Sequence, residues 1–397
     1  MTTIHLPYTA ARPAPAAGVA TPAVRLALAP DLAGLQAEWR AFEAEAAGTP
    51  YQRLDWIAAA AGTLVSEADL RIVVGRDVTG ALALVLPLAL RRRGPLVVAG
   101  PVGGRHANFH GGLWRPGAAF GDPGTLLREA GRLAGADALA LPCVPRRWDE
   151  AANPLAPAGA PAATDPAPAL RLEATAEETL KRATSKDARK QLRQKEKGLA
   201  ELGPVALRRA STPDEIEALL AALEAQKAER RRTTGLPNPL DAPELGAFLR
   251  RACLVGLEGG ASPVELYGLM AGERPAAILA AAADGRRLSG MLISFEAADP
   301  AVARRSPGDI LIGHVIAEQC RRGRAVLDLG IGAARYKDRF CDGAEDLAEV
   351  LVPVTALGHA YAAASRGASR LRRRVKESPW AFALLRRLRR GRAAIEG

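Results

Sequence analysis

Cysteine is scarce in this sequence of 397 residues. The four that occur, Cys143, Cys253, Cys320 and Cys341, form no CxxC pair and have no Cys/His spacing suited to zinc. We therefore interpret them as reduced thiols in a cytosolic setting. The chain also lacks a GxSxG motif and any recognisable Ser-His-Asp or Cys-His grouping, so the common signatures of covalent nucleophilic catalysis are missing.

Long apolar runs are missing too. The longest, residues 81–90, is about half of the roughly 20 residues that a membrane-spanning helix needs, and Pro87 lies inside it. The first residues contain no basic segment followed by an apolar one, so no signal peptide is predicted. We expect a cytoplasmic protein without a membrane-spanning segment.

The net charge of +11 is concentrated in two segments. Residues 361–397 carry +9 and residues 181–197 carry +6, so the rest of the chain carries −4. Because the body of the protein is mildly acidic, a general nucleic-acid-coating role is disfavoured.

Each basic segment has two interpretations. The helix predicted over 181–197 is either a solvated surface or a guide for a polyanionic acceptor or a lipid-linked sugar phosphate. In the tail, residues 370–376 and 386–392 are basic and flank an apolar stretch. That mixture suits an amphipathic helix in peripheral contact with an anionic membrane, or a disordered basic tail.

Hydrophobic periodicity predicts the same order of elements in both halves of the chain: a strand, two helices, a three-stranded meander, a helix and a strand. This is the element order of a GNAT (acyl-CoA N-acyltransferase) core. It predicts an α/β (α+β) fold with a tandem duplication, mixed central sheets flanked by helices, and a basic C-terminal helical tail. The expected parts are a flexible leader at 1–23, an N-terminal domain at 24–165, a C-terminal domain at 166–360 and the tail at 361–397. A Pro/Ala-rich stretch at 153–168 is the predicted linker.

Several short motifs follow one another in the second half. They are the basic run SKDARKQLRQK at 185–195, LxxLG at 199–203, LYGLMAGERPAA at 266–277, SPG at 306–308, LDLGIG at 327–332 and RYK at 335–337 with Phe340 behind it. The first half adds Trp39, TPYQ at 49–52 and Asp55-Trp56. Together they resemble the cellulose-biosynthesis-type GNAT acetyltransferases of bacteria, the CelD/BcsL family, over about residues 24–376. The resemblance also implies kinship with Fem-type transferases, which use two GNAT-like halves.

The resemblance implies an acyltransferase that uses acetyl-CoA or another acyl-CoA and no metal. The acceptor would be an amine or hydroxyl of a polysaccharide or cell-envelope precursor, acylated directly without a covalent enzyme intermediate. Two alternatives stay open: a Fem-type transferase that uses aminoacyl-tRNA, and a non-catalytic scaffold of a polysaccharide synthase. The expected location is the cytoplasm, with possible peripheral contact at the inner membrane through the tail.

The cofactor-binding residues predicted on this basis are Arg305, Ser306, Gly308 and Leu311, at the start of a helix whose N–H groups suit phosphate. The motif departs from the GNAT rule there, because Ile310 replaces a small residue and Asp309 adds a negative charge. A plain loop and helix start is the competing interpretation.

The predicted catalytic residues follow the final strand of the second half. Asp328 lies in an otherwise buried strand, where an unpaired carboxylate is costly. Tyr336 could protonate the leaving thiolate, and Lys337 could bind phosphate or polarise the carbonyl. An Asp–Lys pair that fixes the turn is the structural alternative.

The predicted acceptor-binding residues are Trp56, His106, His110 and Tyr267. The two histidines lie in a Gly-rich loop and do not suffice for zinc, which takes three protein ligands in catalytic sites. Ordinary loop histidines are the alternative interpretation.

Overall fold

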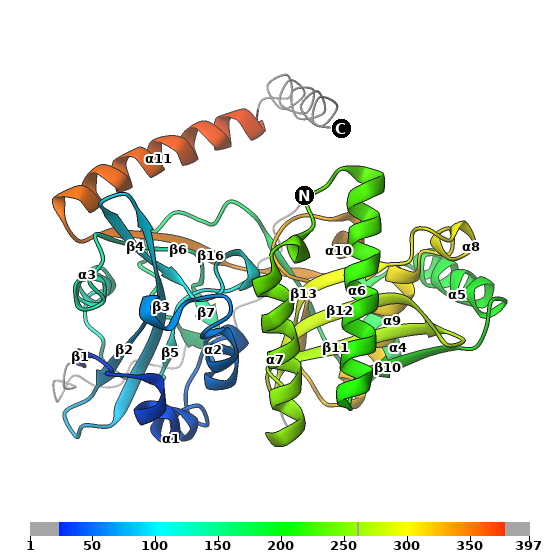
Figure 1. Cartoon of the computed structure of the whole chain (residues 1–397), viewed down its shortest axis with the longest axis horizontal. Helices are drawn as coiled ribbons and strands as arrows, with labels where there is room; N and C mark the ends of the chain where they lie inside the picture. The colour runs from blue at the N-terminus through cyan, green and yellow to red at the C-terminus, as the bar shows by residue number, and fades with distance from the viewer. Residues whose placement is uncertain (1–23, 260–261, 378–397) are drawn as a thin grey trace.

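The computed structural model describes residues 24–259 and 262–377. Two mixed sheets lie next to each other, each flanked by helices (Figure 1). The expected leader at 1–23 and the second basic cluster of the tail lie outside the described residues. No helix in the described part of the chain has both the length and the apolar character needed to span a bilayer.

The first sheet has the strand order β1-β2-β3-β4-β6-β16, with β5 paired to β3. Strands β2, β3 and β4 form an antiparallel meander, and β6 lies parallel to β4 after the crossover helix α3. The elements of this half are β1 (Arg25–Leu28), α1 (Leu32–Phe42), α2 (Leu54–Ala60), β2 (Leu70–Arg76), β3 (Leu82–Arg93), β4 (Leu96–Pro101), β5 (Leu113–Trp114), α3 (Pro123–Leu133), β6 (Ala138–Pro145), β7 (Arg147–Trp148) and β8 (Ala151–Ala152).

The second sheet has the order β10-β11-β12-β13-β14-β9-β15. Its meander is β11, β12 and β13, and β14 lies parallel to β13 after the crossover helix α9. The elements are β9 (Ala167–Arg171), α4 (Ala176–Ala183), α5 (Lys186–Ala200), β10 (Val205–Arg209), α6 (Pro213–Thr234), α7 (Pro243–Gly259), β11 (Val264–Ala271), β12 (Arg274–Ala283), β13 (Arg287–Phe295), α8 (Pro300–Ala303), α9 (Pro307–Arg321), β14 (Val326–Asp328), α10 (Arg335–Phe340) and β15 (Gly343–Glu345).

The predicted order of elements is confirmed in both halves, and the fold is a tandem α/β arrangement with mixed sheets. The basic helix expected over 181–197 is instead two helices, α4 and α5. Ser185 has extended backbone angles between them, and its hydroxyl accepts a hydrogen bond from the Ala188 N–H at 3.1 Å, which starts a new helix.

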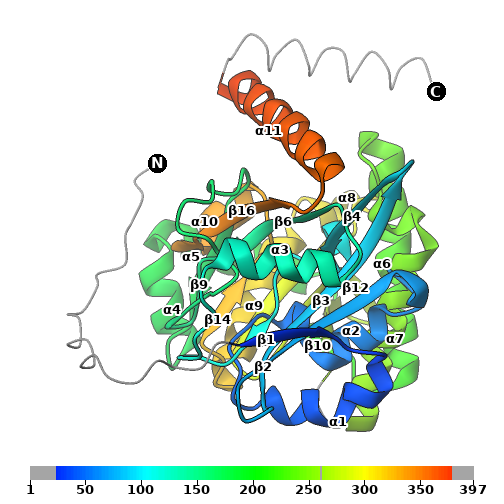
Figure 2. The same ribbon diagram turned by 90° about the vertical axis from the view of Figure 1, so that its left-hand side faces the viewer.

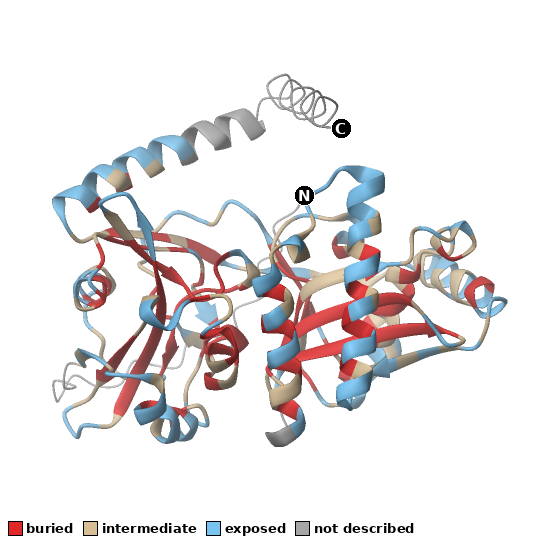
Figure 3. Cartoon of the chain, in the orientation of Figure 1, coloured by how far each residue is buried: buried red, intermediate tan, exposed pale blue. Residues whose placement is uncertain are grey.

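The meander of the second half has two buried faces. Leu266 and Ile278 belong to the apolar core that includes α6 and α7, whereas the adjacent Tyr267 and Leu279 belong to the core under α9. Alternate side chains of a strand point to opposite faces, so α6 and α7 cover one face of the sheet and α9 covers the other. Both meanders are buried along most of their length (Figure 3).

The two halves share one apolar core. Helix α2 of the first half packs against α7 of the second, with the rings of Trp56 and Phe248 4.9 Å apart between their centres. One guanidinium nitrogen of Arg251 donates to the carbonyl of Ala61 at 2.7 Å at the same contact. The halves are therefore joined by packing as well as by the chain.

The C-terminal part of the chain returns to the first half. Strand β16 (Leu347–Pro353) pairs antiparallel with β6, and helix α11 (Ala356–Glu377) packs over both (Figure 2). We expected the second domain to cover residues 166–360. In the structure, strand β16, which begins at residue 347, belongs to the first sheet instead. Pairing with β16 satisfies the backbone groups of what would otherwise be an open edge of β6.

Candidate active site

The site lies where β13 and β14 separate. The two parallel strands pair over three residues only, and the last pair is Ser289 with Asp328. Beyond it β13 continues to Phe295, while the other chain turns away at Gly330. Gly330 has φ +81°, and a Cβ there would lie 2.5 Å from the carbonyl oxygen of Gly290, so only glycine fits this close approach.

A cavity of about 320 Å³ opens at this separation. Its walls come from β12 and β13, from α6, α9 and α10, from the segment between β14 and α10, and from one loop of the first half. The lining residues are Asn108, Lys227, Arg230, Leu279, Gly290, Met291, Leu292, Ile293, Ile312, Leu329, Gly330, Ile331, Gly332, Ala333, Ala334, Tyr336 and Lys337.

Asp328 is fully buried directly behind this cavity. Its Oδ1 accepts hydrogen bonds from the Ser289 hydroxyl at 2.7 Å and from the Gly330 N–H at 3.1 Å. Its Oδ2 lies 3.6 Å from a guanidinium nitrogen of Arg287 and has no hydrogen-bond partner among the described residues. Burial raises the pKa of Asp328 to about 6, although Arg287 and the two hydrogen bonds oppose the rise. The carboxylate therefore fixes the base of the cleft and does not line it.

The first half contributes side chains to the same place. The Tyr51 hydroxyl lies 2.8 Å from Oγ of Ser289. The amide nitrogen of Asn108 donates to the Tyr51 hydroxyl at 2.7 Å and to the carbonyl of Gly290 at 2.8 Å, and the Asn108 oxygen lies 3.5 Å from the Ile331 N–H. Asn108 thus bridges β13 and the segment that follows β14.

Lys337 and Tyr336 lie next to each other in the cavity wall, on α10. Lys337 is buried, and its Nζ donates to the carbonyls of Gly330 at 2.8 Å and Ile331 at 3.0 Å, which closes the loop after β14. Burial lowers the pKa of Lys337, and Asp328 opposes that shift. Burial raises the pKa of Tyr336 to about 12, so its hydroxyl stays protonated at neutral pH. The structure therefore brings the three predicted catalytic residues together.

Two cations of α6 lie in the cavity wall as well. Burial, followed by repulsion from Arg230, lowers the pKa of Lys227 to about 8. A lysine with such a pKa exchanges protons near physiological pH, as a general base requires. Neither residue was predicted from the sequence, where Lys227 and Arg230 look like part of an exposed charged helix end.

The predicted cofactor residues surround the start of α9. Ser306 has a left-handed backbone (φ +51°), a strained conformation for a residue with a side chain. A Cβ on Gly308 would meet only Phe295, at an ordinary 3.9 Å, so the protein leaves space there. Arg305 is bound to Glu201, and the Leu311 side chain is buried in the core, so it is not available to a cofactor.

The negative charge of Asp309 is compensated in the structure. Its Oδ2 accepts hydrogen bonds from Lys195 at 3.1 Å and from Arg339 at 2.5 Å. Two cations and one anion therefore meet at the N-terminal end of a 15-residue helix, which already favours anions. The departure from the GNAT motif at this position does not make the helix start repulsive to phosphate.

The predicted acceptor-binding residues lie elsewhere. His110 is buried and joins its loop to β6, with Nδ1 accepting from the Cys143 N–H at 3.1 Å. Burial lowers the pKa of both His106 and His110 to about 4, so both rings are neutral at pH 7. Neither lines the cavity; their neighbour Asn108 does. Among the described residues, no three His, Cys, Asp or Glu side chains are grouped as a metal site requires.

Trp56 and Tyr267 are fully buried and have structural contacts. Trp56 packs between the halves, and the Tyr267 hydroxyl donates to Glu265 at 2.5 Å while it accepts from Arg322 at 2.8 Å. The hydrogen bonds of Tyr267 place it in a polar cluster under α9 and not in the cavity. Both residues were predicted to bind the acceptor, but their burial gives them a packing role.

Comparison with known proteins identifies the region that contains the cleft. Residues 186–338, which run from α5 to α10, match the family model described as the acetyltransferase (GNAT) domain. No curated protein matches the sequence.

Solved structures with a similar fold share little sequence with the chain. FemX is 11% identical, with a TM-score of 0.51 over 80% of this chain and 94% of its own. A tandem GNAT protein from the clavulanic acid biosynthesis pathway is 13% identical, with a TM-score of 0.42 over 83% and 98%. The C-terminal domain of a putative lysylphosphatidylglycerol synthetase from Agrobacterium fabrum is 12% identical, with a TM-score of 0.49 over 84% and 95%. Residues 186–338 thus match an acetyltransferase (GNAT) domain, and the chain as a whole shares its fold with FemX.

Proposed function

We propose that the chain is an acyl-CoA-dependent acyltransferase, specifically an acetyltransferase of the CelD/BcsL type that its motifs resemble. The acceptor is an amine or hydroxyl of a polysaccharide or cell-envelope precursor. The observation that carries this proposal is the cavity at the separation of β13 and β14, with Tyr336 and Lys337 in its wall and Asp328 behind it.

The residues around α9 fit the coenzyme. Its pyrophosphate would be held by Lys195, Arg339 and the backbone N–H of Gly308, where the cations outnumber the carboxylate of Asp309. The thioester would then extend between β13 and the segment after β14 into the cavity. The space over Gly308 and the paired charge of Asp309 support this assignment.

The cavity residues supply what direct acyl transfer needs. The acceptor nitrogen or oxygen attacks the thioester carbon, the carbon–sulfur bond breaks, and coenzyme A leaves as a thiolate. Lys227 takes the acceptor's proton, Lys337 stabilises the charge that develops on the carbonyl oxygen, and Tyr336 gives its proton to the thiolate. No bond to the protein forms. Asp328 acts through Ser289 and Gly330 as a positioning residue.

Calorimetric titration with acetyl-CoA, coenzyme A and an aminoacyl-tRNA tests the donor. We expect saturable binding of the first two and no binding of the third. Binding of the aminoacyl-tRNA alone would instead support a Fem-type transferase. If none of the three compounds binds, the remaining hypothesis is a non-catalytic scaffold. Release of coenzyme A from acetyl-CoA, followed with a thiol reagent over a panel of amino sugars and sugar alcohols, then tests the transfer itself.

A further inference from the structure

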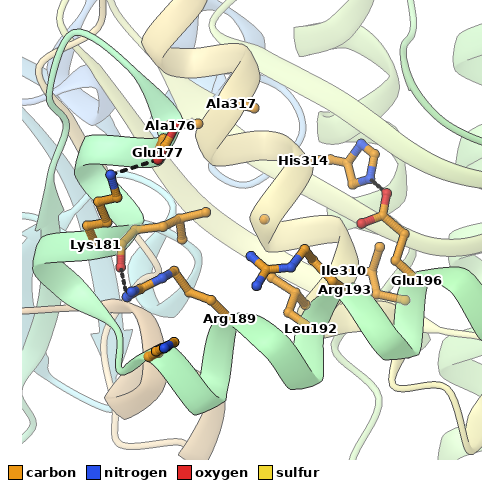
Figure 4. Close-up of a pocket in the computed structure, with 13 residues that line it drawn as sticks. Ala176, Glu177, Lys181, Arg189, Leu192, Arg193, Glu196, Ile310, His314 and Ala317 are labelled. Carbon is orange, nitrogen blue, oxygen red and sulfur yellow. Dashed lines mark hydrogen bonds and ion pairs between the residues drawn. The ribbon is translucent and has the colours of Figure 1, made fainter.

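A second cavity, of about 620 Å³, lies between α4, α5 and α9 (Figure 4). It shares no residue with the cavity at β13 and β14. We call it the α5 groove. Its lining residues are Ala176, Glu177, Leu180, Lys181, Lys186, Arg189, Leu192, Arg193, Glu196, Ile310, Gly313, His314 and Ala317.

The floor of the α5 groove is aliphatic. Leu180 comes from α4, Leu192 from α5, and Ile310 and Ala317 from α9. Leu180 and Leu192 are only partly buried. No Phe, Tyr or Trp is among the lining residues. A groove of this size lies within the range of small-molecule sites, and its floor suits an alkyl chain.

The rim of the groove is cationic. On α5, Lys186, Arg189 and Arg193 follow at spacings of three and four, so they share the helix face that turns toward the groove. Side chains of Arg189 and Arg193 extend into the space between the helices (Figure 4). A helix that packs against a neighbour usually presents an apolar stripe there, whereas α5 presents three positive charges and one carboxylate beside a single leucine.

The four cations of the rim, which include Lys181, outnumber its two carboxylates. Glu177 pairs with Lys181 at 2.7 Å and is also attracted by Arg189, and Glu196 lies 2.7 Å from the ring nitrogen of His314. Among the described residues, no carboxylate forms a direct ion pair with Lys186, Arg189 or Arg193. Arg189 also donates to the carbonyl of Leu180 at 3.3 Å, which holds its guanidinium at the break between α4 and α5.

We propose that the α5 groove binds one anionic membrane phospholipid. Its phosphate lies among Lys186, Arg189 and Arg193, and an acyl chain lies over Leu180 and Leu192. A phosphate complements the excess of positive charge on the rim, and the aliphatic floor complements the chain. An RNA strand fits less well because sequence-tolerant binding of bases uses aromatic stacking platforms, and the groove has no Phe, Tyr or Trp to provide one. The inference does not depend on the proposed acyl transfer.

The position of α5 also suits a membrane surface. The helix lies at the outer edge of the second half (Figure 1), and its exposed Lys190 and Lys197 add charge outside the groove. Basic residues at such a position are attracted to anionic lipid headgroups. A lipid in the groove would therefore hold the protein against the bilayer from which the lipid comes.

The test uses the full chain and a soluble lipid probe. Titration with myristoyl lysophosphatidylglycerol, kept below its micelle concentration, is compared with the zwitterionic myristoyl lysophosphatidylcholine. We expect the anionic probe to bind at least roughly 10-fold more tightly, since each cation near a phosphate contributes about a fivefold factor. Equal binding of the two probes, or no binding of either, would overturn the proposal.

Two double variants on α5 distinguish binding in the groove from general attraction by the positive charge of the helix. Lys186→Gln with Arg193→Gln removes two groove cations and should weaken binding of the anionic probe by roughly 10- to 30-fold. Lys190→Gln with Lys197→Gln removes the same charge from outside the groove and should change it by less than about twofold. Equal weakening in both pairs would indicate a nonspecific basic surface and reject the groove.

A third variant tests the apolar part. Ala317→Phe fills the floor without changing the charge, and we expect it to abolish binding of the lipid while the melting temperature stays within about 3 °C of the parent chain. An unchanged affinity would contradict the assigned chain position. Tight binding of a single-stranded RNA oligonucleotide that the Lys186→Gln and Arg193→Gln pair abolishes would replace the lipid with a nucleic acid.

Discussion

Ser289 and Asp328 are the last paired residues of β13 and β14, and the hydroxyl of Ser289 donates to Oδ1 of Asp328 at 2.7 Å. This hydrogen bond therefore lies at the point where the two strands part. The same hydroxyl lies 2.8 Å from that of Tyr51, which belongs to the first half of the chain. The base of the cleft is thus a polar contact between both halves, and the second half does not form it alone.

The buried carboxyl of Asp328 predicts a pH-dependent stability. Its pKa is about 6 in the folded chain and close to 3.8 when unfolded, so ionisation is disfavoured by folding. Between about pH 4 and pH 6 the native state holds more protons, and stability falls as the pH rises. Asp328→Asn keeps an acceptor for Ser289 and Gly330. We expect the variant to gain up to about 3 kcal/mol relative to the parent chain between pH 4 and pH 7.5.

Urea unfolding of both proteins at the two pH values measures this difference, because titration of all other groups cancels between them. A difference that stays constant from pH 4 to pH 7.5 would mean that Asp328 does not titrate in this range.

Asn108→Ala should weaken the contact between the halves. The substitution removes the hydrogen bonds to Tyr51 and Gly290 and leaves the Tyr51 hydroxyl with its contact to Ser289 alone. We expect a loss of about 1–3 kcal/mol in the free energy of unfolding, together with slower acyl transfer because the walls of the cleft are no longer tied. As a control on the same loop, Arg105→Ala changes an exposed side chain and should leave both quantities unchanged. Equal stability of Asn108→Ala and the parent chain would contradict the bridging role.

The sequence alone indicates which local parts of this cleft lie close together. Asp328, Tyr336 and Lys337 are close in the chain, so one strand and the following turn bring them together. The order of the elements is likewise a sum of local patterns, which a single sequence carries. The bridging partners Tyr51 and Ser289 are 238 residues apart, and no local pattern indicates that their strands and loops meet.

Other differences between the sequence-based predictions and the structure also arise from contacts between distant parts of the chain. Strand β16 resembles a continuation of the second domain, but the open edge of β6 determines where it pairs. Asp309 looks repulsive to phosphate in the sequence, and only the fold brings Lys195 and Arg339 to it. Lys227 is one of many charged residues on α6, and its lowered pKa depends on burial that the sequence does not reveal.

The variants Tyr267→Phe and Tyr336→Phe together distinguish a structural tyrosine from a catalytic one. Its hydroxyl bonds to Glu265, Arg322 and Gln319, all away from the cavity. We expect a loss of about 1–3 kcal/mol in stability with unchanged kcat and KM. Tyr336→Phe, in contrast, should keep its stability and lower kcat by about 100-fold. A raised KM for the acceptor in Tyr267→Phe would instead indicate that Tyr267 contributes to acceptor binding.

Lys337→Ala should abolish most of the turnover. The ammonium closes the loop after β14 and faces the cavity, where it can stabilise charge on the carbonyl oxygen. Loss of such a donor typically lowers kcat by about 10²- to 10³-fold. Calorimetry should still detect coenzyme binding, because α9 provides the phosphate contacts. Lys190→Ala, on the surface of α5, is the matched control and should keep full turnover. Full turnover in Lys337→Ala would contradict the role of Lys337 in stabilising charge on the carbonyl oxygen.

The lowered pKa of Lys227 predicts how the rate of acyl transfer depends on pH. A general base must be neutral, so kcat/KM should rise with pH through about 8, the pKa that burial and Arg230 impose on Lys227. Lys227→Gln should remove this limb and lower kcat/KM at pH 8.5 by about 10²- to 10⁴-fold. Arg230→Gln should keep the limb and move it to higher pH, because the cation that disfavours protonation of Lys227 is gone. The two variants together distinguish a base from a phosphate contact: if Lys227 only binds an anion, neither substitution shifts the midpoint, and both raise KM.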